Sequence, residues 1–143
     1  MHHFPPWDGW EALAAQRRWD VGVVVSFGYL LPPEVFGSFR TACINVHPSL
    51  LPRHRGAAPL VHTILSGDTE TGVTIMALSA QLDAGDILHT TRVPVAPDVT
   101  YAALHDQLAA ISAQAAVDVV PRLPQLLAQR TAQVVCGTPL KSA

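Results

Sequence analysis

A chain of 143 residues, 49% of them hydrophobic and 14% charged, is long enough for one folded domain and too apolar to be disordered. The net charge of −2 argues against a dedicated nucleic-acid-binding module, which carries a basic excess. The sequence has no run of about 18 apolar residues that could span a membrane. Its seven histidines and two cysteines form no metal-binding motif, so we expect no metal.

The first half of the chain predicts two buried strands and two short helices. Residues 20–27 form a β-branched apolar run that ends at Gly28, as expected for a strand buried on both faces. Residues 42–45 form a second apolar strand, before a proline-rich loop. Prolines in the first helical turn predict short helices at residues 32–36 and 59–65.

The second half predicts a strand pair, a long helix and a last strand. Residues 73–78 and 87–95 are two runs that we expect to form neighbouring strands. A helix begins at Thr100, a good N-cap, and the apolar residues that repeat at helical spacing are Leu104, Leu108, Ile111, Ala115 and Val119. Prolines beyond residue 120 interrupt this helix, and residues 132–135 complete the sheet. Together these elements predict an α/β domain with a mostly parallel sheet.

Asn45 and His47 are the first candidate site residues. They stand two apart at the end of the strand at residues 42–45, so both side chains project from one side of it. Ligands bind at such strand ends in open α/β sheets. Asp83 offers a carboxylate, although Asp near Gly is also common in turns.

The motifs around these residues resemble those of the folate-dependent formyltransferases. Asn45-x-His47 and the loop Ser49–Pro52 are shared across that family. The branch that acts on methionyl-tRNA is matched further by Arg55–Pro59, Gly67–Thr69, Thr71–Met76 and Asp83–Asp86. This likeness runs from about residue 19 to the C-terminus and implies a partial Rossmann-like domain.

The resemblance implies a reaction and roles for three residues. A formyl group passes from 10-formyltetrahydrofolate, a cosubstrate, to the amino group of initiator methionyl-tRNA for translation initiation. Negative charge develops on the formyl oxygen, and we expect Asn45 and His47 to donate hydrogen bonds to it. Asp83 is expected to relay protons, through a water molecule, and to fix the tautomer of His47.

The resemblance also implies binding residues for folate and tRNA. The expected folate-contacting residues are Ser49, Leu50, Leu51 and Pro52, with Phe27, Gly28 and Leu30 lining the pterin pocket. The alternative to folate binding by Ser49–Pro52 is that these residues only form a rigid proline turn. The alternative for residues 26–31 is that they only end a strand. Arg53 and Arg55, with His54 between them, are candidates for the phosphates of tRNA, or are solvated surface side chains.

The family likeness predicts that both flanks of the domain are absent. We expect a lead-in at residues 1–18, an incomplete catalytic domain at 19–137 that lacks its opening strands, and the start of a linker at 138–143. Two alternatives stay open: a noncatalytic truncated fragment, and a related enzyme that formylates another amine. The fragment is expected to be inactive, to aggregate and to bind tRNA weakly, whereas the family is monomeric.

The run at residues 23–31 is more similar to the animal mitochondrial form than to bacterial ones. A location in the mitochondrial matrix follows from that likeness. The chain itself shows no targeting segment.

Overall fold

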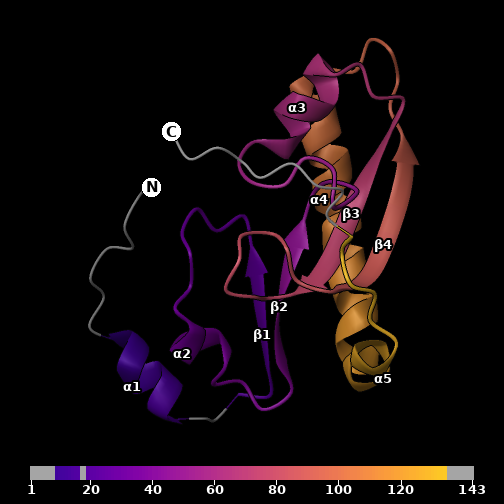
Figure 1. Cartoon of the computed structure of the whole chain (residues 1–143). Helices are drawn as coiled ribbons and strands as arrows, with labels where there is room; N and C mark the ends of the chain where they lie inside the picture. Colours follow the sequence, from indigo (N-terminus) through magenta and orange to yellow (C-terminus); the bar gives the residue numbers. More distant parts are fainter. Residues whose placement is uncertain (1–8, 17–18, 135–143) are drawn as a thin grey trace.

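The computed structural model describes residues 9–16 and 19–134. It has four strands in the order β1-β2-β3-β4, and the long helix α4 lies along one face of the sheet (Figure 1). The strands are β1 (Val21–Val25), β2 (Ala42–His47), β3 (Glu70–Ala77) and β4 (Ile87–Pro94). The helices are α1 (Gly9–Gln16), α2 (Pro33–Phe36), α3 (Pro59–Leu65), α4 (Tyr101–Val119), the 3-10 turn η1 (Val120–Arg122) and α5 (Leu123–Ala128).

The sheet is mixed, and the expectation of a mostly parallel sheet is wrong. Among the strands of the described residues, β1 and β2 run parallel, whereas β3 is antiparallel to both β2 and β4. The physical reason is that an apolar run shows that a strand is buried but not which way it points. The direction of β3 depends on the chain between residues 48 and 69, which brings the strand back beside β2.

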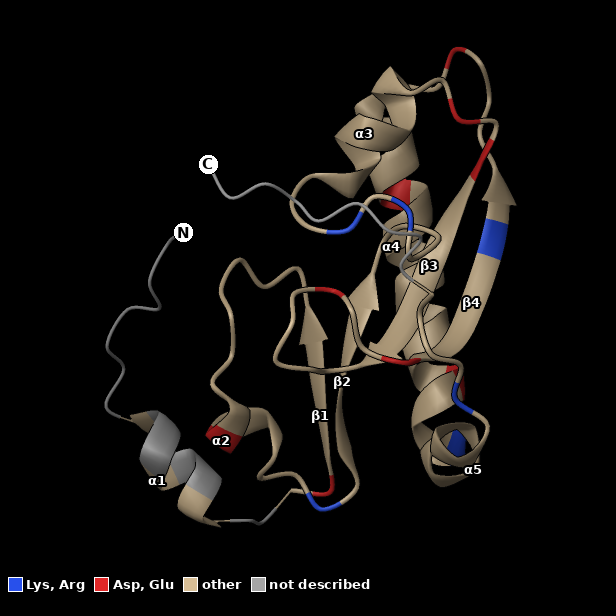
Figure 2. Ribbon diagram, viewed as in Figure 1, with Lys and Arg blue, Asp and Glu red and all other residues tan. Residues whose placement is uncertain are grey.

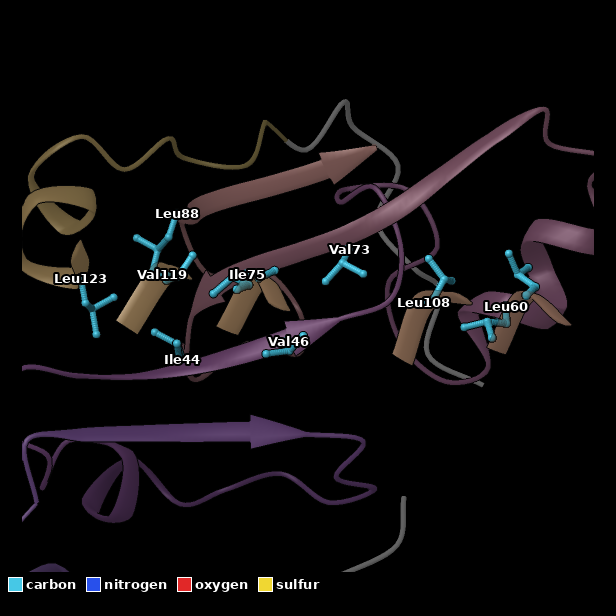
Figure 3. Packing of buried hydrophobic residues seen from close by; sticks show 11 residues of the cluster. Ile44, Val46, Leu60, Val73, Ile75, Leu88, Leu108, Val119 and Leu123 are labelled. Atoms are coloured by element: carbon cyan, nitrogen blue, oxygen red, sulfur yellow. The ribbon is translucent and has the colours of Figure 1, made fainter. Parts of the chain in front are cut away.

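The core lies between the sheet and α4, as Figure 3 shows. One face of β2 contributes Ile44 and Val46, and β3 contributes Val73 and Ile75. The helical partners buried against them are Leu104, Leu108, Ala115, Val119 and Leu123. Because side chains alternate along a strand, Cys43, Asn45 and His47 point to the opposite face of β2.

The predicted helices appear close to their expected places. α3 spans the residues expected for it, and Thr100 caps α4 by accepting a hydrogen bond from the Ala103 amide over 3.2 Å. α4 ends just before Pro121, where a 3-10 turn replaces it. α1 was not predicted; it packs against α2.

The last predicted strand is absent from the described residues, which end at 134. Thr131 forms an isolated bridge with Ile87, and no strand follows it. Beyond Thr131, the side chain of Gln133 turns toward two loops, as described below, and Val134 is 80% exposed.

β1 is an edge of the sheet and carries exposed apolar side chains. Val23 is 45% exposed and Val25 is 53% exposed. An open strand edge with apolar residues favours association with another chain. Within the described part of the chain, no helix is both long and apolar enough to cross a membrane.

Candidate active site

Asn45 and His47 lie at the carboxyl end of β2, on the face opposite α4. β2 is central in the sheet and pairs with both β1 and β3, so its end is held on two sides. The side chain of His47 is buried, with 5% of the residue exposed, and Asn45 is half-buried beside it. The strand thus presents an amide and an imidazole from one face, as the spacing predicts.

The structure brings Asp83 to these two residues. Its Oδ1 accepts a hydrogen bond from Nδ2 of Asn45 over 3.3 Å, and its Oδ2 lies 3.6 Å from Nδ1 of His47. The amide of Gly56 also donates to Oδ2 over 2.8 Å. The carboxylate therefore touches both candidate residues of β2 and a third group from the proline-rich loop.

The backbone around Asp83 is tightly constrained. Asp83 has a φ of 47°, a left-handed conformation that Asp tolerates better than most residues. Two positions later, a Cβ on Gly85 would stand 1.7 Å from the carbonyl oxygen of Ala77, so only glycine fits there. The Asp-x-Gly spacing therefore serves a close turn, as one of the two alternatives for Asp83 expected, and the catalytic role of its carboxylate stays a prediction.

The tautomer of His47 follows from its other nitrogen. Nε2 lies 2.9 Å from the carbonyl oxygen of His54, and because a carbonyl can only accept, Nε2 carries the hydrogen. In the neutral imidazole, the lone pair is then on Nδ1, which faces Asp83. In that tautomer, Nδ1 is a hydrogen-bond acceptor and His47 offers no free N–H.

The loop Ser49–Pro52 is fixed to β3 by Thr74. The hydroxyl of Thr74 donates to the carbonyl of Ser49 over 2.7 Å and accepts from the amide of Leu51 over 3.1 Å. The Ser49 hydroxyl donates to the carbonyl of Arg53, and Ser49 is fully buried. The contribution of Ser49 in this structure is therefore to the shape of the loop, while Pro52 is exposed.

Asp68 holds the next part of the loop. It pairs with the guanidinium of Arg53, and its Oδ2 lies 2.6 Å from Nε2 of His54. Hydrogen bonds from Arg53, and then from His54, lower the pKa of Asp68 to about 2. Because the His54 carbonyl contacts His47, this cluster of Arg53, His54 and Asp68 helps to hold the candidate site in position.

Arg55 is held by a residue that sequence reasoning missed. Its Nε donates to Oε1 of Gln133 over 3.0 Å. Gln133 is distant in sequence and stands in a run expected to be a strand, so no local pattern pointed to it. Arg53 and Arg55, the candidates for tRNA phosphates, thus both make contacts within the chain, and the predicted tRNA contact stays a prediction.

The expected pterin-pocket residues follow β1. Since β1 and β2 are parallel, the loop after Val25 begins beside the end of β2. Phe27 lines a hollow of about 260 Å³ together with Val35 and Cys43, whereas Gly28 and Leu30 do not line it. Asn45, His47 and Asp83 do not line this hollow either.

The charges in the described part of the chain are mixed. Figure 2 shows Lys and Arg segments interspersed with Asp and Glu segments rather than gathered on one element.

In residues 9–16 and 19–134, no group of three or more His, Cys, Asp or Glu side chains is placed to hold a metal ion.

Comparisons with known proteins point to one family. A model of the formyl transferase family matches residues 10–120. The methionyl-tRNA formyltransferase of Burkholderia pseudomallei is 55% identical over 104 residues, which are 73% of this chain and 32% of that protein. The chain thus spans about a third of the length of this curated relative. The relative is bacterial and gives no support to the expected animal mitochondrial origin.

Solved structures agree with the fold. A 4-N formyltransferase from Francisella tularensis matches 91% of this chain and 52% of its own, with a TM-score of 0.74 and 23% identity. The formyltransferase PseJ from Anoxybacillus kamchatkensis, solved with a formamido sugar nucleotide and tetrahydrofolate, matches 83% of this chain and 62% of its own. Its TM-score is 0.70, with 25% identity. The fold, the clustered Asn45, His47 and Asp83, and the family match lead to one conclusion: the chain belongs to the formyl transferase family.

Proposed function

We propose that the chain forms part of an enzyme that transfers a formyl group from 10-formyltetrahydrofolate to the amino group of initiator methionyl-tRNA, for translation initiation. The observation that carries the proposal is the contact of one carboxylate, Asp83, with both Asn45 and His47. The 55% identity to a methionyl-tRNA formyltransferase favours methionyl-tRNA as the acceptor. The mitochondrial location expected from residues 23–31 stays a prediction.

The side chains of the candidate site have the chemistry needed for a reaction between a formyl donor and an amine. An amide nitrogen has two hydrogens, and Asn45 commits one of them to Asp83 over 3.3 Å. The second is the donor that we assign to the charge developing on the formyl oxygen. Loss of one such donor typically lowers turnover by roughly a hundredfold to a thousandfold.

His47 and Asp83 supply the proton transfers. The attacking amine must lose a proton, and the folate nitrogen that leaves must gain one. The lone pair on Nδ1 of His47 accepts the first proton, and the Asp83 carboxylate 3.6 Å away stabilises the resulting cation. The same proton then passes to the leaving nitrogen, so neither residue is consumed. The sequence predicts His47 as a hydrogen-bond donor to the formyl oxygen. We assign it instead as a proton carrier, because its Nε2 hydrogen is bonded to the His54 carbonyl.

Folate is assigned to the loop that Thr74 fixes. The hydrogen bonds of Thr74 to Ser49 and Leu51 hold the loop rigid next to His47, with Leu50 half-buried and Pro52 exposed, and a rigid loop suits recognition of a flat heterocycle. Phe27, Gly28 and Leu30 remain the proposed pterin-side residues. Tetrahydrofolate in the PseJ structure is consistent with a folate donor in this family.

A graft into a longer relative tests the proposal. Residues 19–134 replace the aligned segment of the Burkholderia methionyl-tRNA formyltransferase, and formylation is measured with 10-formyltetrahydrofolate. Methionyl-tRNA, glycinamide ribonucleotide and an amino sugar nucleotide are the three acceptors. We expect formyl transfer to methionyl-tRNA that is lost in His47→Ala.

The other outcomes are equally informative. Transfer to a different acceptor would reassign the substrate. A folded graft without any formyl transfer would favour the noncatalytic alternative and overturn the proposal. The 143-residue chain, run in parallel, is expected to be inactive.

A further inference from the structure

The side chain of Gln133 lies between two loops of the candidate site. Its Nε2 donates to the carbonyl oxygens of Asp83 over 3.1 Å and Gly85 over 2.8 Å. Its Oε1 accepts from both Nε and Nη2 of Arg55. Both the donor and the acceptor end of this amide are therefore engaged, on opposite loops.

These contacts converge on the Asp83 carboxylate. Arg55 immediately precedes Gly56, whose amide donates to Oδ2 of Asp83 over 2.8 Å. Gln133 therefore holds the backbone that carries the carboxylate and also the residue next to the amide that binds it. Neither a carboxylate nor an ammonium group can replace it, because one lacks donors and the other lacks acceptors.

The bound backbone is one that needs support. Asp83 has a φ of 47°, a conformation that even Asp adopts less readily than glycine does, so contacts with the surroundings help to hold it. The two carbonyls that Gln133 binds belong to Asp83 itself and to Gly85, two residues later in the same turn. Without the amide, these carbonyls lose their partner and the turn loses an anchor.

We propose that Gln133 is a positioning residue that sets the Asp83 carboxylate in reach of His47 by tying the Asp83–Gly85 turn to Arg55. The proposal rests on the proposed formyl transfer for its catalytic consequence. Gln133 touches no reacting atom in this reading. A misplacement of about 1 Å at a reacting group can lower turnover by roughly a hundredfold, so the expected loss of turnover is about tenfold to a hundredfold.

The first measurement does not depend on activity. The Gly56 amide proton, bound to a carboxylate, is shifted downfield in an NMR spectrum of the 15N-labelled chain, and Asp83→Ala defines its position without the bond. We expect Gln133→Ala and Gln133→Glu to move this resonance toward the Asp83→Ala position. The matched control is Gln125→Ala, at an exposed position of α5, which should leave it unchanged.

The second measurement is the split between kcat and KM in the graft described above. In Gln133→Ala and Gln133→Glu, kcat should fall by about tenfold to a hundredfold while KM for folate stays within about twofold. Gln133→Glu keeps the side-chain length and the acceptor for Arg55, so it reports on the two donated hydrogen bonds even if Gln133→Ala fails to fold.

Each outcome decides between the two proposals. An unchanged Gly56 resonance in a folded Gln133 variant, or a moved resonance with unchanged kcat, would overturn the positioning role. A resonance that depends on Gln133 in a chain whose graft has no formyl transfer would support the geometry and overturn the proposed function instead.

Discussion

Nδ1 of His47 lies 3.6 Å from Oδ2 of Asp83, although the two residues come from different segments of the chain. This distance is slightly longer than a hydrogen bond, so a neutral imidazole with its lone pair on Nδ1 can face the carboxylate. Protonation of Nδ1 turns the same pair into an ion pair in a buried site. The proposed proton transfer uses this change from a neutral contact to an ion pair.

The first prediction concerns this pair. In the graft, His47→Ala and Asp83→Asn should each lower kcat by about a hundredfold or more, because both act on protons and charge in the transition state. Folate binding, measured by titration calorimetry, should stay nearly intact. Asp98→Asn is the matched control, since Asp98 is exposed. Full turnover in Asp83→Asn would remove Asp83 from the proton relay.

A second prediction concerns Thr74. Thr74→Val keeps the shape of the side chain but leaves the Ser49 carbonyl and the Leu51 amide without their partner. The free energy of unfolding should fall by about 1–3 kcal/mol, measured by urea denaturation. In the graft, KM for folate should rise. Thr90→Val, at the exposed position that pairs with Thr74 on β4, should change neither quantity. An unaltered KM for folate would show that this loop does not contribute to folate binding.

The third prediction is a pH dependence of stability. The pKa of Asp68 is lowered from 3.8 to about 2, first by the hydrogen bond from Arg53 and then by His54. A lowered folded-state pKa stabilises the fold above the unfolded value, and that contribution is lost as the pH falls toward 2. The difference in unfolding free energy between the parent chain and Asp68→Asn should therefore be constant above about pH 5 and shrink toward pH 2. A difference that does not change with pH would contradict this account.

The fourth prediction concerns the open edge of the sheet. The chain should self-associate through β1, where Val23 and Val25 are exposed. Val23→Lys should shift the chain toward monomer in gel filtration at equal concentration, because charged edge residues oppose strand pairing. Val117→Lys, at a 68% exposed position on α4, is the control and should have no such effect. A monomeric parent chain would show that this edge is protected in another way.

The sequence predicts local elements well because their causes are local. Thr100 caps α4, and the prolines end it, within a few residues of the features they control. Asn45 and His47 fall on one face because their spacing alone determines that. The direction of β3 and the partner of Arg55 depend instead on residues far apart in sequence, and the spacing of hydrophobic residues does not predict either of them.

The contact of Gln133 with the Asp83–Gly85 turn spans 50 residues to the Asp83 carbonyl. A ribosome makes the chain from its N-terminus, so β2, the proline-rich loop and the turn are all synthesised before the amide that joins them. Until residue 133 leaves the exit tunnel, Asp83 lacks this anchor. The anchor of the candidate site is therefore made only after strands β1 to β4 and all of α4 have become available to fold.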